Sequence, residues 1–339
     1  MKGLLNKVAN ALLAVIPVKG DSRSEWIRKL SFLLAFAVFL STAYYIVDEV
    51  WLQPHYTEQV NHSLRDLYEK GEQKPQTPAD NNDEPIVFPE GMDPSFEPLY
   101  RRNQDVVAWL KFTADQNGTK EDLFLGAIDN PVVQAADNEY YLNRDFMGGN
   151  DKAGTLFMDY RNDFANINEE HNVVIYGHNL NSKQMFSRFN TLVSGNVDRA
   201  RQLTTVTVDT MYGESITYKV FAVMVLDADA TGNAYFDYIR NEFNSEKSKA
   251  TFLEKIQARS LYIYGDVDVL PTDQLLTLST CSNKRDTTLK RGRTVVVARR
   301  VREGEDVSVD PALTVANPDV LMPKAWYQNK GLAVPKEYQ

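Results

Sequence analysis

The sequence is poor in groups that cross-link chains, bind metals or bind nucleic acids. Its 339 residues include a single cysteine, Cys281, which excludes an internal disulfide. The four histidines form no convincing metal-binding cluster, so we expect no metal and no cofactor. The net charge is −9, and residues 1–29 carry +4, which leaves −13 on the remainder. This acidic remainder lacks the basic surface that nucleic acids require, so we expect no nucleic-acid partner.

One apolar run is long enough to cross a membrane. The segment Leu30–Val47 contains no charged residue, and as a helix it spans about 27 Å, close to the hydrocarbon thickness of a bilayer. Tyr44, Tyr45 and Trp51 lie at its far end, as is typical of a membrane interface. A cleaved signal peptide is the alternative, but about thirty residues precede the run, which is long for the n-region of a signal peptide. We therefore predict an uncleaved single-pass anchor.

The charges around this run predict its orientation. Arg28 and Lys29 precede it, and Asp48 and Glu49 follow it. The positive-inside rule places the N-terminus in the cytoplasm and the chain after residue 52 outside the cell. Residues 5–15 carry apolar side chains at helical spacing. They form either an amphipathic helix on the inner leaflet or a frayed helix without a membrane role.

The next part of the chain contains a predicted helix, a linker and a second predicted helix. Residues 57–70 have helical character, and residues 68–94 are rich in Pro, Asp, Asn and Glu, which is typical of an extended linker. Further on, Leu99, Val106, Trp109 and Leu110 have a spacing that places them on one face of a helix.

From residue 122 onward the pattern is mainly β. Short β-rich runs, bounded by Gly, Asn and Asp, occupy residues 123–128, 131–134, 140–142, 154–160, 172–177, 204–208, 215–227, 274–281 and 293–301. A helix with Phe252, Leu253 and Ile256 as its apolar stripe precedes the strand that contains the cysteine. Roughly eight strands with interspersed helices favour a closed barrel over a βαβ repeat.

Cys281 lies at the end of one of these strands. Alternation places Leu276 and Leu278 on the core face, and it places Thr277, Ser279 and Cys281 on the other face. A lone cysteine is usually a small buried hydrophobic residue. Its position on the more polar face, at the strand end, favours an accessible thiol instead.

A nucleophilic thiol needs a base or a charged partner. His55 and His62 are close to the membrane, and His171 begins a strand where we expect it to be solvated. His178 follows Gly177 at the end of a strand, and this glycine permits a tight turn. A hydrogen-bonded loop histidine is the alternative, but one cysteine with one well-placed histidine favours a catalytic pair.

Three arginines follow the cysteine and are candidates for stabilising an oxyanion. Arg285 lies in a polar loop, and Arg291 is separated from the next strand by Gly292. Arg293 immediately precedes the apolar run 294–298, so its backbone should be held in the strand. Because oxyanion donors must be fixed before charge develops, we assign this role to Arg293, with Arg291 as the runner-up.

Several motifs, in order, resemble the sortase family and are similar to its class B branch. They are "PVVQAADNEYYLNRDF", "AGTLFMDYRN", "YGHN", "MFSRF", "RSLYIYGDVDV" and "TLSTC", the last followed by an arginine and a "VVVA" strand. The resemblance covers roughly residues 97–302. It implies a mixed, mainly β fold: a sortase-type closed eight-stranded barrel with N-terminal helices and an extra helix before the cysteine strand, preceded here by the transmembrane helix.

The resemblance also implies an activity. A sortase of class B is a cysteine transpeptidase of Gram-positive bacteria that recognises a C-terminal sorting signal of the Asn-Pro-Gln-Thr-Asn type on surface proteins. It transfers the acyl group to a peptidoglycan amine. By the same resemblance, Tyr176, Ser279 and Thr280 help to line the signal groove. The expected parts of the chain are a cytoplasmic segment 1–29, an anchor 30–52, an extracellular stalk and linker 53–95, a catalytic domain 96–305 and a C-terminal extension 306–339.

Three other functions fit the same residues. A membrane-tethered cysteine peptidase forms the same thioester but uses water as the acceptor. A pilin-polymerising sortase uses a lysine of another pilin. A cell-wall scaffold does not use its thiol at all, and alkylation of Cys281 would leave it functional.

Overall fold

The computed structural model describes residues 14–70, 86–112, 128–179, 184–282 and 289–339. Most of the predicted linker, residues 123–127 of the strand predicted at 123–128, most of the N-terminal segment 5–15, and Arg285 lie outside these ranges. The chain forms two compact units, residues 1–56 and residues 57–339. Each is described by itself.

The first unit is built on the apolar helix α2, Arg23–Val47. Ser22 caps it: its hydroxyl accepts from the backbone N–H of Glu25, whose side chain bonds back to the cap residue. A π-helical turn, Asp48–Leu52, continues the helix into α3, Gln53–Lys70. Among the described residues, the continuous helix 23–70 is the one that is long and apolar enough to cross a membrane.

From residue 57 onward, α3 belongs to the second unit and packs against the rest of it. Leu64 is buried, and the ring of Tyr68 stacks on that of Trp109 with centroids 4.5 Å apart. Arg65 forms an ion pair with Asp129 at 2.8 Å. We expected the whole of 53–95 to be stalk and linker. Residues 57–70 instead belong to the compact unit, because the helix has an apolar face that the barrel buries.

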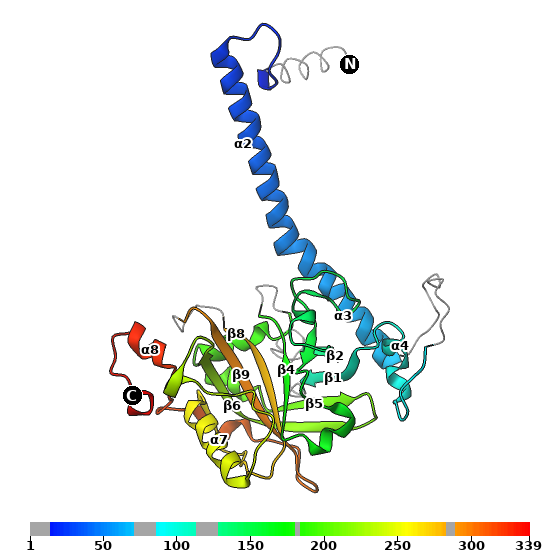
Figure 1. Cartoon of the computed structure of the whole chain (residues 1–339), viewed down its shortest axis with the longest axis vertical. Coiled ribbons are helices and arrows are strands. Elements are labelled where there is room, and N and C mark those ends of the chain that lie inside the picture. Colours follow the sequence, from blue (N-terminus) through cyan, green and yellow to red (C-terminus); the bar gives the residue numbers. More distant parts are fainter. Residues whose placement is uncertain (1–13, 71–85, 113–127, 180–183, 283–288) are drawn as a thin grey trace. The chain divides into compact units, whose positions relative to one another are not determined.

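The second unit is a closed eight-stranded barrel, as predicted (Figure 1). The strand order around it is β1-β2-β3-β4-β8-β9-β6-β5. The β2–β3 and β4–β8 pairs are parallel, and the other pairs are antiparallel. The strands are β1 Val106–Phe112, β2 Asp129–Val133, β3 Leu156–Met158, β4 Asn172–Tyr176, β5 Thr205–Thr210, β6 Ser215–Asp227, β8 Leu275–Ser282 and β9 Gly292–Arg300.

Two local predictions were wrong. Residues 97–112 are not one helix: a single turn, α4 Glu97–Tyr100, precedes strand β1. Val106, Ala108, Trp109 and Leu110 are all fully buried, so this strand has apolar residues on both faces and lacks the alternation that identifies a half-buried strand. The β-rich run 140–142 is a 3-10 turn, Tyr140–Asn143.

The predicted helix before the cysteine strand is α7, Glu246–Arg259. Ser245 caps its N-terminus, and Phe252, Leu253 and Ile256 bury its apolar stripe against the barrel. A short strand after it, β7 Tyr262–Tyr264, pairs outside the barrel with β10, Thr314–Ala316. The remaining helices are short: α5 Asn190–Val193, α6 Val197–Arg201 and α8 Lys324–Asn329.

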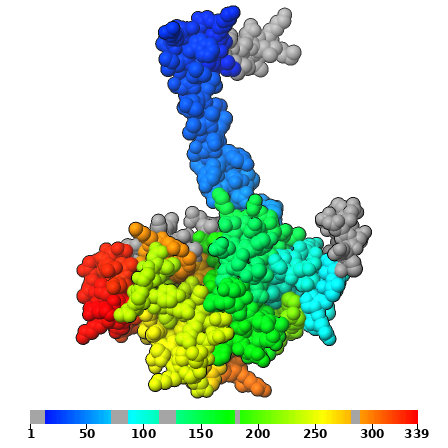
Figure 2. Space-filling model, in the orientation of Figure 1, coloured from blue at the N-terminus to red at the C-terminus, as the bar shows by residue number. Residues whose placement is uncertain are grey.

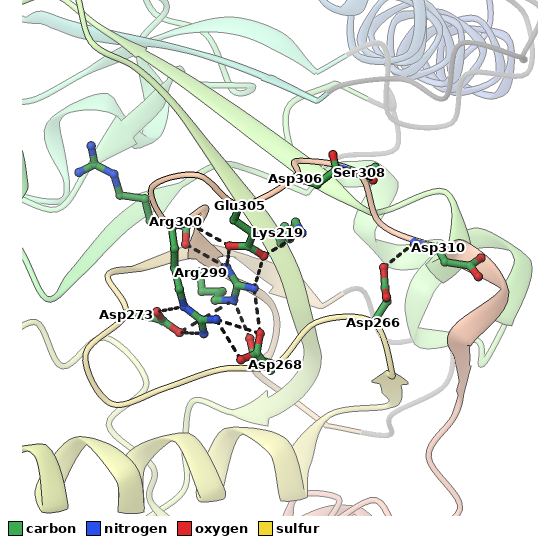
Figure 3. Close-up of polar contacts among 11 residues, drawn as sticks. Lys219, Asp266, Asp268, Asp273, Arg299, Arg300, Glu305, Asp306, Ser308 and Asp310 are labelled. Atoms are coloured by element: carbon green, nitrogen blue, oxygen red, sulfur yellow. Dashed lines mark hydrogen bonds and ion pairs between the residues drawn. The ribbon is translucent and has the colours of Figure 1, made fainter.

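A buried ion network fixes one end of β9 (Figure 3). The guanidinium of Arg299, 1% exposed, donates to both oxygens of Glu305, at 2.7 and 2.6 Å, and also bonds Asp268. Lys219 on β6 adds an ion pair to Glu305 at 2.8 Å. Hydrogen bonds from Arg299 and Lys219 hold the pKa of Glu305 well below its usual range. The network lies at the opposite end of β9 from Arg293.

Residues 306–339 fold back onto the barrel rather than leaving it (Figures 1 and 2, red). The side chain of Asn317 donates to the carbonyl of Ser260 at 2.8 Å, and the backbone N–H of Leu321 donates to the carbonyl of Ala258 at 2.8 Å. Met322 packs in a small cluster with Val225 of β6. This segment is therefore an integral part of the second unit.

Candidate active site

Strand β8 carries the cysteine between two partner strands, β4 and β9. In the antiparallel β8–β9 pair, the Cys281 position lies directly opposite Arg293, next to the last pair, Ser282 and Gly292. Directly opposite positions of an antiparallel pair share one face of the sheet, with Cβ atoms about 5 Å apart. The cysteine and this arginine are therefore neighbours at one rim of the barrel.

The parallel β4–β8 pair brings the histidine to the same level. Tyr176 is registered with Ser279, and the backbone N–H of Gly177 donates to the carbonyl of Ser279 at 3.1 Å. His178 comes two residues after Tyr176, and Cys281 comes two residues after Ser279. Adjacent strands lie about 4.8 Å apart, so this register brings the histidine and the cysteine close together.

Gly177 is required by packing at this turn. A Cβ atom there would lie 2.5 Å from Cδ2 of Leu156 and 2.8 Å from Cδ2 of Phe186. Both neighbours are buried core residues that cannot move freely. The residue before the histidine is therefore glycine because no side chain fits.

The ring of His178 is held by a backbone carbonyl. Its Nε2 atom forms a hydrogen bond with the carbonyl oxygen of Leu142, in the turn 140–143. A carbonyl only accepts, so Nε2 carries the proton in this arrangement and Nδ1 is left for a reacting group. Gly154, with φ +61°, makes room: a Cβ there would lie 2.8 Å from the Leu142 oxygen and 3.2 Å from Cδ2 of His178.

The two described arginines differ in their surroundings. Arg293 is half-buried in β9, and its Nη1 atom donates to the Gly292 carbonyl at 3.2 Å. Arg291 precedes the strand, has a side chain that is 64% exposed, and forms an ion pair with Asp229 at 3.1 Å. Arg293 is thus held by the sheet register, whereas Arg291 lies on an exposed turn.

The three predicted groove residues are more enclosed than we expected. Ser279 is buried, and its hydroxyl lies 2.9 Å from that of Tyr238. Thr280 is also buried, and its Oγ1 has no hydrogen-bond partner among the described residues. Tyr176 is half-buried, and its ring stacks on that of Phe157 with centroids 5.2 Å apart. Direct contact of these three with a peptide stays a prediction.

The Tyr176 hydroxyl is hydrogen-bonded to a carboxylate that is itself part of an ion pair. It donates to Oδ2 of Asp159 at 2.8 Å, and Asp159 forms an ion pair with Arg161 at 2.8 Å. Burial and the Asp159 charge raise the pKa of Tyr176. Burial alone would raise the pKa of Asp159, but hydrogen bonds from Arg161 and Tyr176 lower it. The phenol therefore stays neutral and the carboxylate stays charged at neutral pH.

Sequence reasoning missed several parts of this site. The Leu142 carbonyl could not be found because a backbone acceptor has no side-chain signature. Tyr238 and Asp159 lie far along the chain from the residues they bond, in segments that carry no motif for this role. Among the described residues, no cluster of three His, Cys, Asp or Glu side chains is arranged to hold a metal ion.

Comparisons with known proteins define the class. The family model of the Sortase domain matches residues 126–301. Sortase B of Staphylococcus aureus is 31% identical over 235 residues, which cover 69% of this chain and 84% of that protein. Sortase B of Listeria monocytogenes is 29% identical over 206 residues, covering 60% of this chain and 72% of that one.

Solved structures agree with these matches. The Staphylococcus aureus sortase B–substrate complex gives a TM-score of 0.56 at 26% identity, covering 75% of this chain and all of that one. Sortase B from Bacillus anthracis in complex with AAEK1 gives a TM-score of 0.55 at 29% identity, with the same coverage. The chain belongs to the sortase family of cysteine transpeptidases. Within that family it is a sortase of class B.

Proposed function

We propose that this enzyme is anchored in the cell membrane and attaches surface proteins to the cell wall. It recognises a C-terminal sorting signal of the Asn-Pro-Gln-Thr-Asn type and transfers the acyl group to a peptidoglycan amine. The observation that carries the proposal is the strand register: the Cys281 position lies opposite Arg293, and both Cys281 and His178 come two residues after the paired positions Ser279 and Tyr176. The similarity to sortase B proteins, one of them solved in a complex with its substrate, supports the transpeptidase part of the proposal.

The proposed first step forms a thioester. The Cys281 thiolate attacks the carbonyl carbon of the signal threonine, and Arg293 stabilises the negative charge that develops on its oxygen. The peptide C–N bond then breaks, and His178, protonated at both nitrogens, gives the Nδ1 proton to the departing amine. The bond from Nε2 to the Leu142 carbonyl persists throughout and holds the ring in place.

The proposed second step reverses these roles. An acceptor amine attacks the thioester carbon, the C–S bond breaks, and a new amide forms. Nδ1 of His178 accepts the proton that the amine loses, and Cys281 returns as thiolate. Tyr176 and Ser279 act mainly by holding the strand ends, through their hydroxyl bonds to Asp159 and Tyr238.

The catalytic roles are tested with an Asn-Pro-Gln-Thr-Asn peptide. Cys281→Ala should abolish its cleavage, and His178→Ala should reduce it by orders of magnitude, because the two groups act as a unit. Mass spectrometry of the wild-type enzyme should detect a thioester when no acceptor is present. When an amine is added, the thioester should give amide product in place of hydrolysis product. Normal turnover by either variant would contradict the proposal, and hydrolysis unaffected by amine would indicate a peptidase.

The membrane assignment is tested separately. Helix α2 supports the anchor, and the basic residues before its apolar run support an N-terminus inside the cell. A protease added to intact protoplasts should digest residues 97–302 and leave the N-terminal segment. Protection of the catalytic domain would show that the orientation is reversed.

A further inference from the structure

A cavity of about 260 Å³ adjoins Arg293. Its walls come from the end of β6, the segment 234–238, the C-terminal end of α7, and the returning segment 306–339. Its lining includes Arg291 and Arg293 together with Leu321, Pro323 and Tyr338 of the returning segment. It therefore lies beside Arg293, whose position is opposite Cys281 in the sheet, and residues 306–339 complete it.

The cavity contains a buried guanidinium that forms no ion pair among the described residues. Arg259, the last residue of α7, lines the cavity and is 8% exposed. Its Nη1 atom donates to the Lys255 carbonyl at 3.0 Å, and its guanidinium lies 4.8 Å from the ring centroid of Phe236. Burial lowers the pKa of Arg259, and Tyr338 and the carboxylate of Glu337 offset this only in part.

Arg299, the other arginine that is buried among the described residues, has different surroundings. Arg299, 1% exposed, bonds both oxygens of Glu305 and one oxygen of Asp268. Buried charges in proteins are normally paired in this way, because an unpaired one is costly. An anionic group entering the cavity would give Arg259 the partner that Arg299 already has.

The other charged residues that line the cavity are mostly positive, like Arg259. Three arginines line the cavity, Arg259, Arg291 and Arg293, against one acid, Asp227. The carboxylate of Asp227 already accepts from the backbone N–H of Asp229 at 3.0 Å, and Arg291 is paired with Asp229 itself. The residues that line the cavity therefore carry more positive than negative charge.

We propose that this cavity binds a carboxylate of the acceptor substrate, with Arg259 as its counter-ion. The proposal rests on the proposed transpeptidase function. The expected sorting signal contains no acidic side chain, whereas peptidoglycan stem peptides carry carboxylates close to their free amine. An acceptor bound here lies beside Arg293, which is paired with the Cys281 position in the sheet.

The test compares two acceptors with the full-length enzyme in detergent. One is the stem tripeptide alanyl-γ-glutamyl-diaminopimelate, and the other is the same peptide with its carboxylates converted to carboxamides. The wild-type KM should be about tenfold lower for the carboxylate acceptor, the range expected for a charged hydrogen bond. Arg259→Gln should raise the KM for the carboxylate acceptor to that of the amide. Arg259→Lys should restore part of the difference, because lysine keeps the charge but not the planar fork.

Arg300→Gln is the matched control. It removes a guanidinium from the other end of β9, where Arg300 bonds Asn168, and should keep the full acceptor preference. Thioester formation without acceptor is measured for every variant. Equal wild-type KM values for the two acceptors would overturn this proposal while leaving the thioester chemistry intact. If Arg259→Gln loses thioester formation and acceptor use to the same extent, the carboxylate proposal is overturned too. If the wild-type enzyme forms no thioester, the transpeptidase proposal itself is overturned.

Discussion

Replacing Gly154 with alanine should slow the enzyme by moving the carbonyl that holds His178. Gly154 has φ +61°, and an added Cβ would lie 2.6 Å from the Tyr141 oxygen and 2.8 Å from the Leu142 oxygen. Both are backbone atoms, so they cannot rotate away as a side chain can. The Leu142 oxygen is also the hydrogen-bond partner of the His178 ring.

The size of the effect follows from these distances. Ordinary contact begins at 3.4 Å, so the Tyr141 and Leu142 oxygens must move by 0.8 and 0.6 Å respectively. A misplacement near 1 Å in a catalytic group costs about a hundredfold in rate. We therefore expect turnover of the sorting peptide to fall about tenfold to a hundredfold. The left-handed backbone adds a loss of stability of about 1–2 kcal/mol.

Gly148→Ala separates the two effects. Gly148 has φ +81°, but a Cβ there would meet no heavy atom within 4 Å. It should lose similar stability in urea unfolding and keep normal turnover. Thioester formation, followed by mass spectrometry, measures the chemical step in both variants. Normal thioester formation by folded Gly154→Ala, or an equal loss in Gly148→Ala, would refute the link between the Leu142 carbonyl and His178.

Two further predictions concern β9 and its ends. Arg293→Ala should reduce turnover about a hundredfold or more, as loss of an oxyanion donor does, whereas Arg291→Ala should cost much less; the reverse order would mean that the role falls on Arg291. Glu305→Gln should lower the free energy of unfolding at pH 7 by about 2 kcal/mol, because Arg299 loses a charged partner. Since the pKa of Glu305 is lowered by folding, its contribution is complete above the unfolded pKa of about 4.3 and is lost as pH falls below it. The difference in free energy of unfolding between Glu305→Gln and wild type should therefore become smaller below that pH. A difference that becomes larger would contradict this reasoning. Glu303→Gln, at an exposed position, is the control.

The barrel was predictable because its later strands carry clear period-two or continuous apolar patterns between turn residues. The β6, β8 and β9 runs were located to within a residue or two. Strand β1 was not, because it is buried on both faces and its spacing imitates a helix. The 140–142 run was rich in β-forming residues, yet it forms the turn that bonds His178, so tertiary contacts overrode local preference.

The candidate site was predictable only in part. We chose Cys281, His178 and Arg293 because each lies at the end of a predicted strand. The register of β4, β8 and β9 is consistent with this choice. The roles of these residues remain predictions. The burial of Ser279 could not be read from parity, because both faces of β8 are covered, whereas Thr280 shares the face of the core leucines and is buried as parity indicates. The cavity beside Arg293 was equally hidden, because residues 306–339 resemble an appendage in sequence and become a wall only when folded.

The position of β8 also determines when the proposed site can form. The Cys281 position meets its partner strands only after β8 has paired with β4, which lies roughly 100 residues earlier in the chain, and with β9, which is made after it. These pairings close the barrel on both sides of β8. A chain that has not yet closed its barrel therefore lacks the proposed site, so folding and the proposed activity begin together.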